Sequence, residues 1–528
     1  MLLTIILISI VACVVAFYVW TTNNRYDYFK HRGISGPPHC FFFGHYKMLW
    51  SSKSLSKQLK EWTGQYGSIY GLFIGTTPMY VVSDVDFLQE VYIKQFSSFH
   101  SRMIGNILRI ETDGRIHLFR AFGARWRRQR HVINPTFSSA KLKLMSPLVN
   151  GCIEAMLNKI STMTTTQHKE INMYELYKRL TMDVICRCAF GIYTDMQNDI
   201  NNPYLLKSAE VFKTDADDML LMRLSNLIPS LARPLHDILF STAEFRRRLI
   251  DAIPFLSNFI TELPHLWLMN RVREVVDQRA KSSSDTKERV DLLQLMMDAS
   301  TADPVIDTAN DHVTSKVLKF EELIPNIFIF MVAGYETTST ALAYSTYVLA
   351  TRPEIQDKLI EEINRHNWKK NNAEENYEMA NILQYLDLFL REVLRMYPIT
   401  VKAMTRECNA NATVCGHTIE KGSIIQPDIF SIHYNPDLWG PEDPNLFIPE
   451  RHLVKRHPIA WMPFGVGPRN CVGMRFALME LKMCLIELLQ QYRILPSDRT
   501  EEGFQRREKI VIQPSAIYVK LEKIRFST

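Results

Sequence analysis

The fold is decided by one stretch of the sequence, Pro463-Phe464-Gly465-Val466-Gly467-Pro468-Arg469-Asn470-Cys471-Val472-Gly473. Glycines two positions apart allow a tight turn in which the backbone closely approaches a neighbour. An amphipathic segment follows this loop directly and predicts a helix. Its apolar face comprises Met474, Ala477, Leu478, Leu481, Leu485 and Leu488. We therefore expect Cys471 at a helix N-terminus, where backbone amides and the helix dipole lower the pKa of a thiol.

A thiolate in this setting could be a nucleophile, a redox sensor or a metal ligand. A nucleophile needs a nearby base, and the sequence contains no familiar nucleophile signature. An axial ligand to haem iron fits better, because that role needs an anionic sulfur shielded by backbone contacts rather than a proton acceptor.

Composition narrows the class of protein. The 528 residues are 46% hydrophobic and 22% charged, which excludes disordered and low-complexity chains. The net charge of +6 is too dilute to indicate nucleic-acid binding. Nine cysteines form an odd set without repeated C-x-x-C spacing, so neither a disulfide framework nor a zinc site is indicated.

The stretch from Phe464 to Gly473 resembles the haem-binding signature of cytochrome P-450 monooxygenases, F-x-x-G-x-R-x-C-x-G, at every fixed position. Three further motifs follow that family's order and spacing. The resemblance extends from a Pro-rich segment near the N-terminus to the C-terminus, and it is strongest with the microsomal clan of vertebrate drug-metabolising enzymes and their invertebrate relatives, such as those of nematodes. It implies haem b as cofactor, with Cys471 as the sulfur ligand of the iron.

The second motif pairs Glu392 with Arg395, three positions apart on one helix face. With the later Pro449-Glu450-Arg451, it is similar to the family's buried triad, here Glu392, Arg395 and Arg451. The family usually has Phe where this chain has His452, a departure that we expect to change local packing while leaving the charges intact.

The third motif, Ala333-Gly334-Tyr335-Glu336-Thr337-Thr338, lies in an apolar helix predicted from about Leu323 to Leu349. Glycine there costs about 1 kcal/mol relative to alanine, and a mid-helix hydroxyl can bond the carbonyl four residues earlier, so we expect a loosened turn. A Ser/Thr-rich packing helix is the alternative, but an unpaired buried carboxylate is costly. The resemblance implies that Glu336 and Thr337 are the acid–alcohol pair that delivers protons during the reaction.

The fourth motif is Trp126-Arg127-Arg128-Gln129-Arg130, in which Trp126 and Arg130 share a helix face. Carboxylates of a buried haem need cations and hydrogen-bond donors. By resemblance, the haem propionates bind Trp126, Arg130, Arg406, Arg469 and Arg102. The residues expected to line an apolar substrate pocket are Phe119, Phe122, Phe328, Phe330, Met331, Ala333 and 399–404, the last of them Met404.

The N-terminus predicts a membrane anchor. Leu2 to Trp20 is an uncharged run of nineteen residues, about 29 Å as a helix and therefore about one bilayer core thick. A cleavable signal peptide is the alternative, but no basic residue precedes the run and its end is bulky and aromatic. Because Arg25, Lys30 and Arg32 follow it, the positive-inside rule predicts a single-pass protein with its catalytic domain facing the cytosol. The resemblance to the microsomal clan implies that the membrane is that of the endoplasmic reticulum.

The expected architecture is mainly α with small β-sheets: one large cytochrome P-450 fold with an N-terminal transmembrane helix. The expected divisions are an anchor (1–22), a basic and Pro-rich hinge (23–40) and a catalytic domain (41–528). Strand signals occur at Ile69–Ile74, Pro78–Val82, Val414–Ile425 and Lys509–Leu521. The apolar stretch 250–269 is either a core helix or a surface that dips into the membrane.

The implied reaction inserts one oxygen atom of dioxygen into a lipophilic xenobiotic, steroid or fatty-acid-like molecule. Electrons come from NADPH through cytochrome P-450 reductase, with cytochrome b5 as a further partner and no nucleic acid. Candidate contacts for an acidic reductase are Arg127, Arg128, Arg475 and Lys482. Two alternatives stay open: a haem-thiolate peroxide isomerase, although such relatives commonly lack the acid–alcohol pair, and a non-catalytic haem-binding sensor or scaffold.

Overall fold

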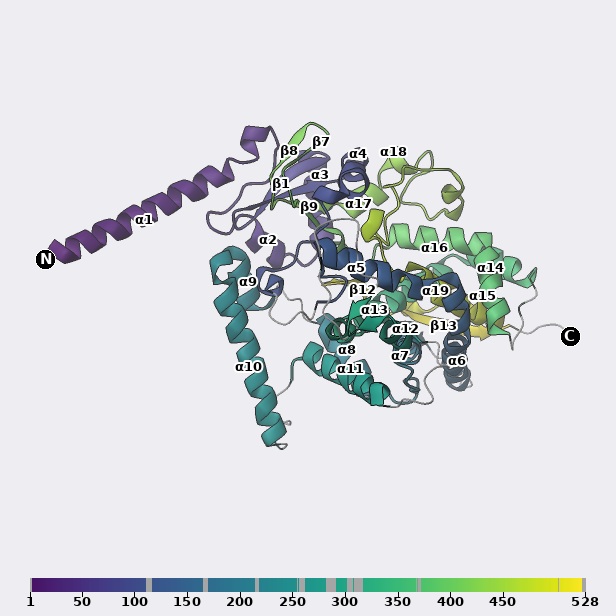
Figure 1. Cartoon of the computed structure of the whole chain (residues 1–528). Coiled ribbons are helices and arrows are strands. Elements are labelled where there is room, and N and C mark those ends of the chain that lie inside the picture. The colour runs from purple at the N-terminus through teal and green to yellow at the C-terminus, as the bar shows by residue number, and fades with distance from the viewer. Residues whose placement is uncertain are drawn as a thin grey trace.

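The computed structural model describes residues 2–110, 116–164, 170–213, 218–253, 255, 262–281, 291–301, 307, 317–366, 368, 372–501 and 503–524. Figure 1 shows a helical body, from which α1 projects beside a small sheet. The helices are α1 (Leu2–Tyr26), α2 (Tyr46–Ser51), α3 (Leu55–Tyr66), α4 (Val85–Gln89), α5 (Gly123–Ile133), α6 (Ser139–Thr164), α7 (Met173–Phe190), α8 (Pro203–Lys213), α9 (Leu220–Leu227), α10 (Ala232–Ala252), α11 (Pro264–Lys281), α12 (Leu292–Asp298), α13 (Phe320–Thr351), α14 (Pro353–Asn364), α15 (Ala373–Ile382), α16 (Gln384–Met396), α17 (Ile429–His433), α18 (Pro436–Trp439), α19 (Met474–Gln491) and α20 (Asp498–Glu501).

The strands are short. They are β1 (Ile69–Ile74), β2 (Thr77–Val82), β3 (Ile171–Asn172), β4 (Ser300–Thr301), β5 (Leu318–Lys319), β6 (Arg406–Glu407), β7 (Ala412–Val414), β8 (His417–Ile419), β9 (Ile424–Pro427), β10 (Tyr492–Pro496), β11 (Arg506–Glu508), β12 (Ile512–Pro514) and β13 (Tyr518–Lys523). The largest sheet has the order β1-β2-β9-β6, with β2 and β9 parallel and the other pairs antiparallel. A second sheet joins β10, β13 and β3. The expected mainly helical architecture with small sheets is confirmed.

Helix α13 runs through the middle of the helical body (Figure 1) and is the framework on which the site is built. Its first turn carries Glu321 and Glu322, where negative charge is favourable to the helix dipole. The Glu322 carboxylate also accepts a hydrogen bond of 3.1 Å from the backbone amide of Lys319. The helix ends at Thr351, and Pro353 begins α14. Proline has no backbone N–H and therefore cannot extend the hydrogen bonds of the preceding helix. Buried residues follow α13 along most of its length, which explains why its sequence is apolar on nearly every face.

The segment that follows α1 is packed against the body, although the sequence predicts a hinge there. Tyr28 and Phe29 are buried, and the Tyr28 hydroxyl lies 3.0 Å from that of Tyr80 in β2. Arg25 and Arg32 form ion pairs of 3.0 and 2.7 Å with Glu420, between β8 and β9. Residues nearly 400 positions away in sequence thus fix the end of α1, which no local pattern could reveal.

The apolar stretch 250–269 falls at the ends of two helices. Helix α11 begins at Pro264, and Leu268 within it is fully buried, as a core helix requires. By contrast, Ile253 and Phe255, which follow α10, are 50% and 68% exposed. Residues 254 and 256–261 lie outside the described residues.

Candidate functional site

The loop before α19 holds Cys471 in a closed turn. The Cys471 amide donates to the Phe464 carbonyl at 2.7 Å, and the Gly465 amide donates to the Met462 carbonyl at 3.0 Å. Gly465 and Gly467 have φ values of 69° and 72°, in the left-handed region. A Cβ on Gly467 would lie 2.1 Å from the Tyr92 carbonyl oxygen. The glycine spacing thus permits both the turn and the close backbone approach, as predicted.

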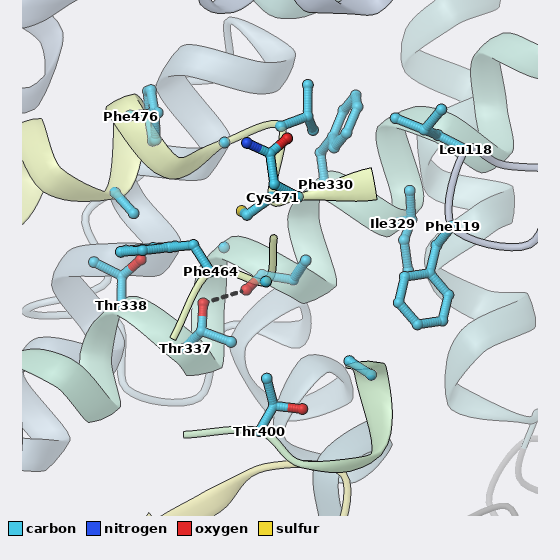
Figure 2. Close-up of a pocket in the computed structure, with 18 of the residues that line it drawn as sticks. Leu118, Phe119, Ile329, Phe330, Thr337, Thr338, Thr400, Phe464, Cys471 and Phe476 are labelled. Atoms are coloured by element: carbon cyan, nitrogen blue, oxygen red, sulfur yellow. Dashed lines mark hydrogen bonds between the residues drawn. The ribbon is translucent and has the colours of Figure 1, made fainter. Parts of the chain in front are cut away.

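Cys471 faces a cavity of about 310 Å³ between this loop and α13 (Figure 2). One face of α13 supplies the opposite wall, where Ala333 and Thr337 lie one turn apart. Further walls come from the segment before α5 and the segment between α16 and β6. Most of the lining side chains are apolar: Leu118, Phe119, Phe137, Ile185, Ile329, Phe330, Ala333, Ile399, Ala403, Met404 and Phe476.

Four guanidinium groups also line the cavity, together with Trp126: those of Arg102, Arg130, Arg406 and Arg469. They donate mainly to backbone carbonyls, for example Arg102 Nε to Ala403 at 3.1 Å and Arg130 Nη1 to Asn470 at 2.8 Å. None of the four forms an ion pair with a carboxylate in the described part of the chain. The buried Nε atoms of Arg406 and Arg469 also have no hydrogen-bond partner there.

Thr337 and Glu336 point in different directions from α13. The Thr337 hydroxyl donates to the Ala333 carbonyl at 2.7 Å and borders the cavity, as the dashed line in Figure 2 shows. The helix nevertheless continues unbroken through this turn, which the sequence predicts to be loosened. The Glu336 carboxyl is buried outside the cavity lining and accepts a hydrogen bond from the Tyr174 hydroxyl of α7.

Glu392, Arg395 and Arg451 meet in one buried cluster. Glu392 Oε2 lies 2.7 Å from Arg395 Nε, and Glu392 Oε1 lies 2.9 Å from Arg451 Nε. His452 joins them through Nε2, 3.0 Å from Glu392 Oε2. The cluster therefore ties α16 to the short 3-10 helix Pro449–Leu453, with a fourth member in place of a packed aromatic ring.

The family model that matches this chain is described as cytochrome P-450, and it covers residues 34–521. The chain belongs to the cytochrome P-450 family. Among its relatives, CYP13A3 of Caenorhabditis elegans is 32% identical, with 98% of each chain covered. CYP13A2 of the same species is 31% identical, with 97% of each chain covered. Cytochrome P-450 3A2 of Rattus norvegicus is 32% identical over 93% of this chain and 91% of its own. The chain is thus a P-450 monooxygenase, related as expected to nematode and vertebrate members.

The site fits the haem b that P-450 proteins bind. Burial, together with repulsion from neighbouring guanidinium groups, lowers the pKa of Arg102 to about 9 and that of Arg469 to about 8. Two propionate carboxylates would relieve this repulsion and pair with the orphaned Nε atoms of Arg406 and Arg469. The residues that would hold the group are therefore Cys471, Trp126 and the four arginines, all of which the sequence singles out.

The pKa of the Cys471 thiol is raised, whereas the sequence predicts that it is lowered. The sulfur is accessible from the cavity but shielded from bulk solvent, and burial is the largest cause of the shift. The Gly473 amide, Arg130 and Arg102 oppose this shift by favouring the thiolate. The loop alone therefore does not lower the pKa of this thiol, and a metal ion bound at the sulfur would favour its deprotonated form.

Only some of the residues predicted to form the substrate pocket line the cavity. Phe119, Ala333 and Met404 line the cavity, whereas Phe122 is 52% exposed outside it and Phe328 does not border it. Phe330 lines it as predicted, Met331 does not, and Ile329 lines it without having been predicted. Ile329 and Phe330 precede Ala333 by four and three positions and so share its helix face, whereas Phe328 precedes it by five. Helical spacing counted from Ala333 could have found Ile329.

Two of the four predicted reductase contacts are wrong. Arg128 is buried and forms ion pairs of 2.7 Å with Glu322 and 2.6 Å with Asp307. Lys482 is 5% exposed and its Nζ lies 3.1 Å from Asp387. Neither side chain can reach a partner at the protein surface. Arg475 at the start of α19 is exposed.

Proposed function

We propose that this P-450 oxidises a lipophilic small molecule with dioxygen, using electrons that a reductase transfers from NADPH, with cytochrome b5 as a second donor. The observation that carries the proposal is the largely apolar cavity around Cys471, which favours a lipophilic occupant over a polar one. The bound haem would supply dioxygen activation, and an anionic sulfur ligand promotes cleavage of the O–O bond. Exposed Arg475 is a candidate contact for an acidic reductase.

Protein groups would supply the proton transfers and the dry environment. The Thr337 hydroxyl donates to the Ala333 carbonyl, so its oxygen can accept a hydrogen bond from a molecule in the cavity. Passing its own proton onward requires that it release Ala333. Glu336 is held by Tyr174, and a rotation of its side chain or an intervening water is needed to replenish the proton on Thr337. Apolar side chains such as Phe119 and Phe330 exclude bulk water from the reaction.

We also propose that the protein is held by α1 in the endoplasmic reticulum membrane, with its body in the cytosol. The span Leu3–Arg32 has the length and hydropathy of a membrane-crossing helix, and its most apolar 18 residues are not buried against the body. The basic residues Arg25 and Arg32 come after the apolar run, as the positive-inside rule requires for a cytosolic body. Reductases that take electrons from NADPH in the same membrane could then reach the body.

The test is a reconstituted system with purified reductase and NADPH. The reduced, carbon-monoxide-bound protein should show the red-shifted Soret band of thiolate ligation, and Cys471→Ala should abolish it. Metabolite profiling with a lipophilic panel should then reveal NADPH-dependent oxidation. Products that form from a lipid peroxide without NADPH would instead indicate an isomerase. Thiolate ligation without turnover of any compound would indicate a sensor or scaffold.

A further inference from the structure

The cavity lining contains two hydroxyl groups that the proposed chemistry does not use. Three threonines line it: Thr337, Thr338 and Thr400. The Thr337 hydroxyl is bonded to Ala333, whereas those of Thr338 and Thr400 have no hydrogen-bond partner in the described part of the chain. In Figure 2, Thr338 lies on the same side of Thr337 as Phe464, and Thr400 lies on the other side. Thr338 belongs to α13, next to Thr337, whereas Thr400 belongs to the segment between α16 and β6.

The segment that carries Thr400 is fixed on both sides. The Ile399 carbonyl accepts a hydrogen bond of 2.7 Å from the Ile512 amide, at the start of β12. The Ala403 carbonyl accepts one of 3.1 Å from Arg102, and the Met404 carbonyl accepts one from the Tyr92 hydroxyl. A β-branched side chain has few rotamers on such a backbone. The Thr400 side chain thus lines the cavity from a backbone that is held in place.

A ligand that fills this apolar cavity must cover the Thr400 hydroxyl. If the ligand offers only carbon, the hydroxyl loses its hydrogen bonds to water and gains none, which is unfavourable. A carbonyl or hydroxyl oxygen on the ligand restores the bond. Sites that contain such a group discriminate strongly against analogues without a matching polar atom.

We propose that Thr400 is a specificity-determining residue that binds a neutral oxygen-bearing group, a ketone or an alcohol, on an otherwise lipophilic substrate. The bond fixes one end of the substrate at the segment between α16 and β6, and so sets which carbon faces Cys471. The inference rests on the proposed function only in taking this cavity as the substrate site.

The experiment compares two probes that differ in one polar group, phenylcyclohexane and 4-phenylcyclohexanone. Their affinities for the purified haem-loaded, full-length protein are measured by titration calorimetry without NADPH. The wild type should bind the ketone about tenfold more tightly than the hydrocarbon, as expected for one buried hydrogen bond. Thr400→Val, which keeps the shape of the side chain, should reduce the preference to less than twofold, and Thr400→Ser should restore it.

An unchanged carbon-monoxide spectrum in each variant shows that fold and haem are retained. A wild type without preference for the ketone, including one that binds neither probe, overturns the inference, as does a Thr400→Val protein that keeps the preference. The result is separable from the proposed function because binding is measured without turnover. A protein that discriminates through Thr400 but oxidises nothing would sustain this inference while removing the proposed activity.

Discussion

At the scale of single residues, the Glu336–Tyr174 contact should govern the pH dependence of turnover. Burial raises the pKa of Glu336, and the Tyr174 hydrogen bond and Lys178 oppose the rise. Tyr174→Phe should raise the pKa further and shift the limb of the pH–rate profile that reports Glu336 to higher pH. Glu336→Gln should remove that limb and lower the rate about 100-fold, as for loss of a general acid. The rate of product formation is measured across pH, together with the NADPH consumed.

The amide of Glu336→Gln can still accept the Tyr174 hydrogen bond, so the variant keeps the local packing. An unchanged rate and profile in both variants would show that Glu336 is a structural group and that protons reach Thr337 by another route. Thr337→Val serves as the matched comparison, since it removes the hydroxyl that borders the cavity while Glu336 stays in place.

His452 should contribute stability that depends on pH. Its ring lies 3.0 Å from Glu392 and is 5% exposed. His452→Phe, which restores the usual family residue, should cost about 1 kcal/mol of unfolding free energy at pH 7 for one lost hydrogen bond. Burial is the main reason that the pKa of His452 is lowered, so the unfolded chain takes up the proton first as the pH falls. The difference between wild type and variant should therefore shrink below about pH 6.5.

Denaturant unfolding of the haem-loaded proteins at pH 7 and pH 5 measures this difference. Glu392→Gln is the reference for breaking the whole cluster, because it leaves two buried guanidinium groups without a carboxylate and should cost about 3 to 5 kcal/mol. A variant difference that grows at pH 5 would mean that His452 is charged in the folded protein.

The residues found from sequence are those that match positions of the family. The Cys471 loop, the four arginines and the Glu392 cluster were identified in this way, and the structure brings each set together. Glu336 and Arg128 differ because their interaction partners lie far away in the sequence. Tyr174 lies 162 positions from Glu336, and Asp307 lies 179 positions from Arg128. A motif that contains a charged residue does not predict which distant residue will pair with it in the fold.

At the scale of elements, the turn before α19 should tolerate no side chain at Gly467. A Cβ there would lie 2.1 Å from the backbone oxygen of Tyr92, which cannot move as the tip of a flexible side chain can. Gly467→Ala should therefore displace the Cys471 loop and abolish haem incorporation. Gly503 provides the control, since its φ of +83° is also left-handed but a Cβ would meet nothing within 4 Å. Gly503→Ala should cost only about 1 to 2 kcal/mol through backbone strain and leave haem content unchanged.

Haem content per protein, from absorbance and protein assay, distinguishes the two variants. Equal haem content in both would show that the loop adapts and that the close approach to Tyr92 is not required. Loss of haem in both would assign the effect to global destabilisation, and thermal unfolding of each variant checks this directly.

Elements with their own periodicity were predictable, whereas contacts between elements were not. Strands β1 and β2 begin and end within one residue of the sequence prediction, because the apolar pattern of a hairpin is visible in the local sequence. The stretch Val414–Ile425 contains three strands, since the turns at Gly416 and Gly422 divide it. The predicted hinge packs against the sheet because Tyr28 meets Tyr80 and Arg32 meets Glu420, contacts that are invisible in a local pattern.

At the scale of the whole molecule, the residues needed for membrane attachment should be separable from those needed for folding. Deleting residues 1–22 removes most of α1 but keeps Tyr28, Phe29 and Arg32, which pack on the β1–β2–β9 region. This truncation should weaken binding to lipid vesicles in a flotation assay while the carbon-monoxide spectrum and stability stay near those of the full chain.

Deleting residues 1–34 should weaken vesicle binding equally but also destabilise the body, because it removes buried Tyr28 and Phe29 and leaves Glu420 without either arginine. Each lost aromatic should contribute about 3 to 5 kcal/mol. Undiminished flotation after the shorter deletion would show that another surface is the main attachment, and equal stability of the two truncations would show that the docked segment adds nothing to the fold.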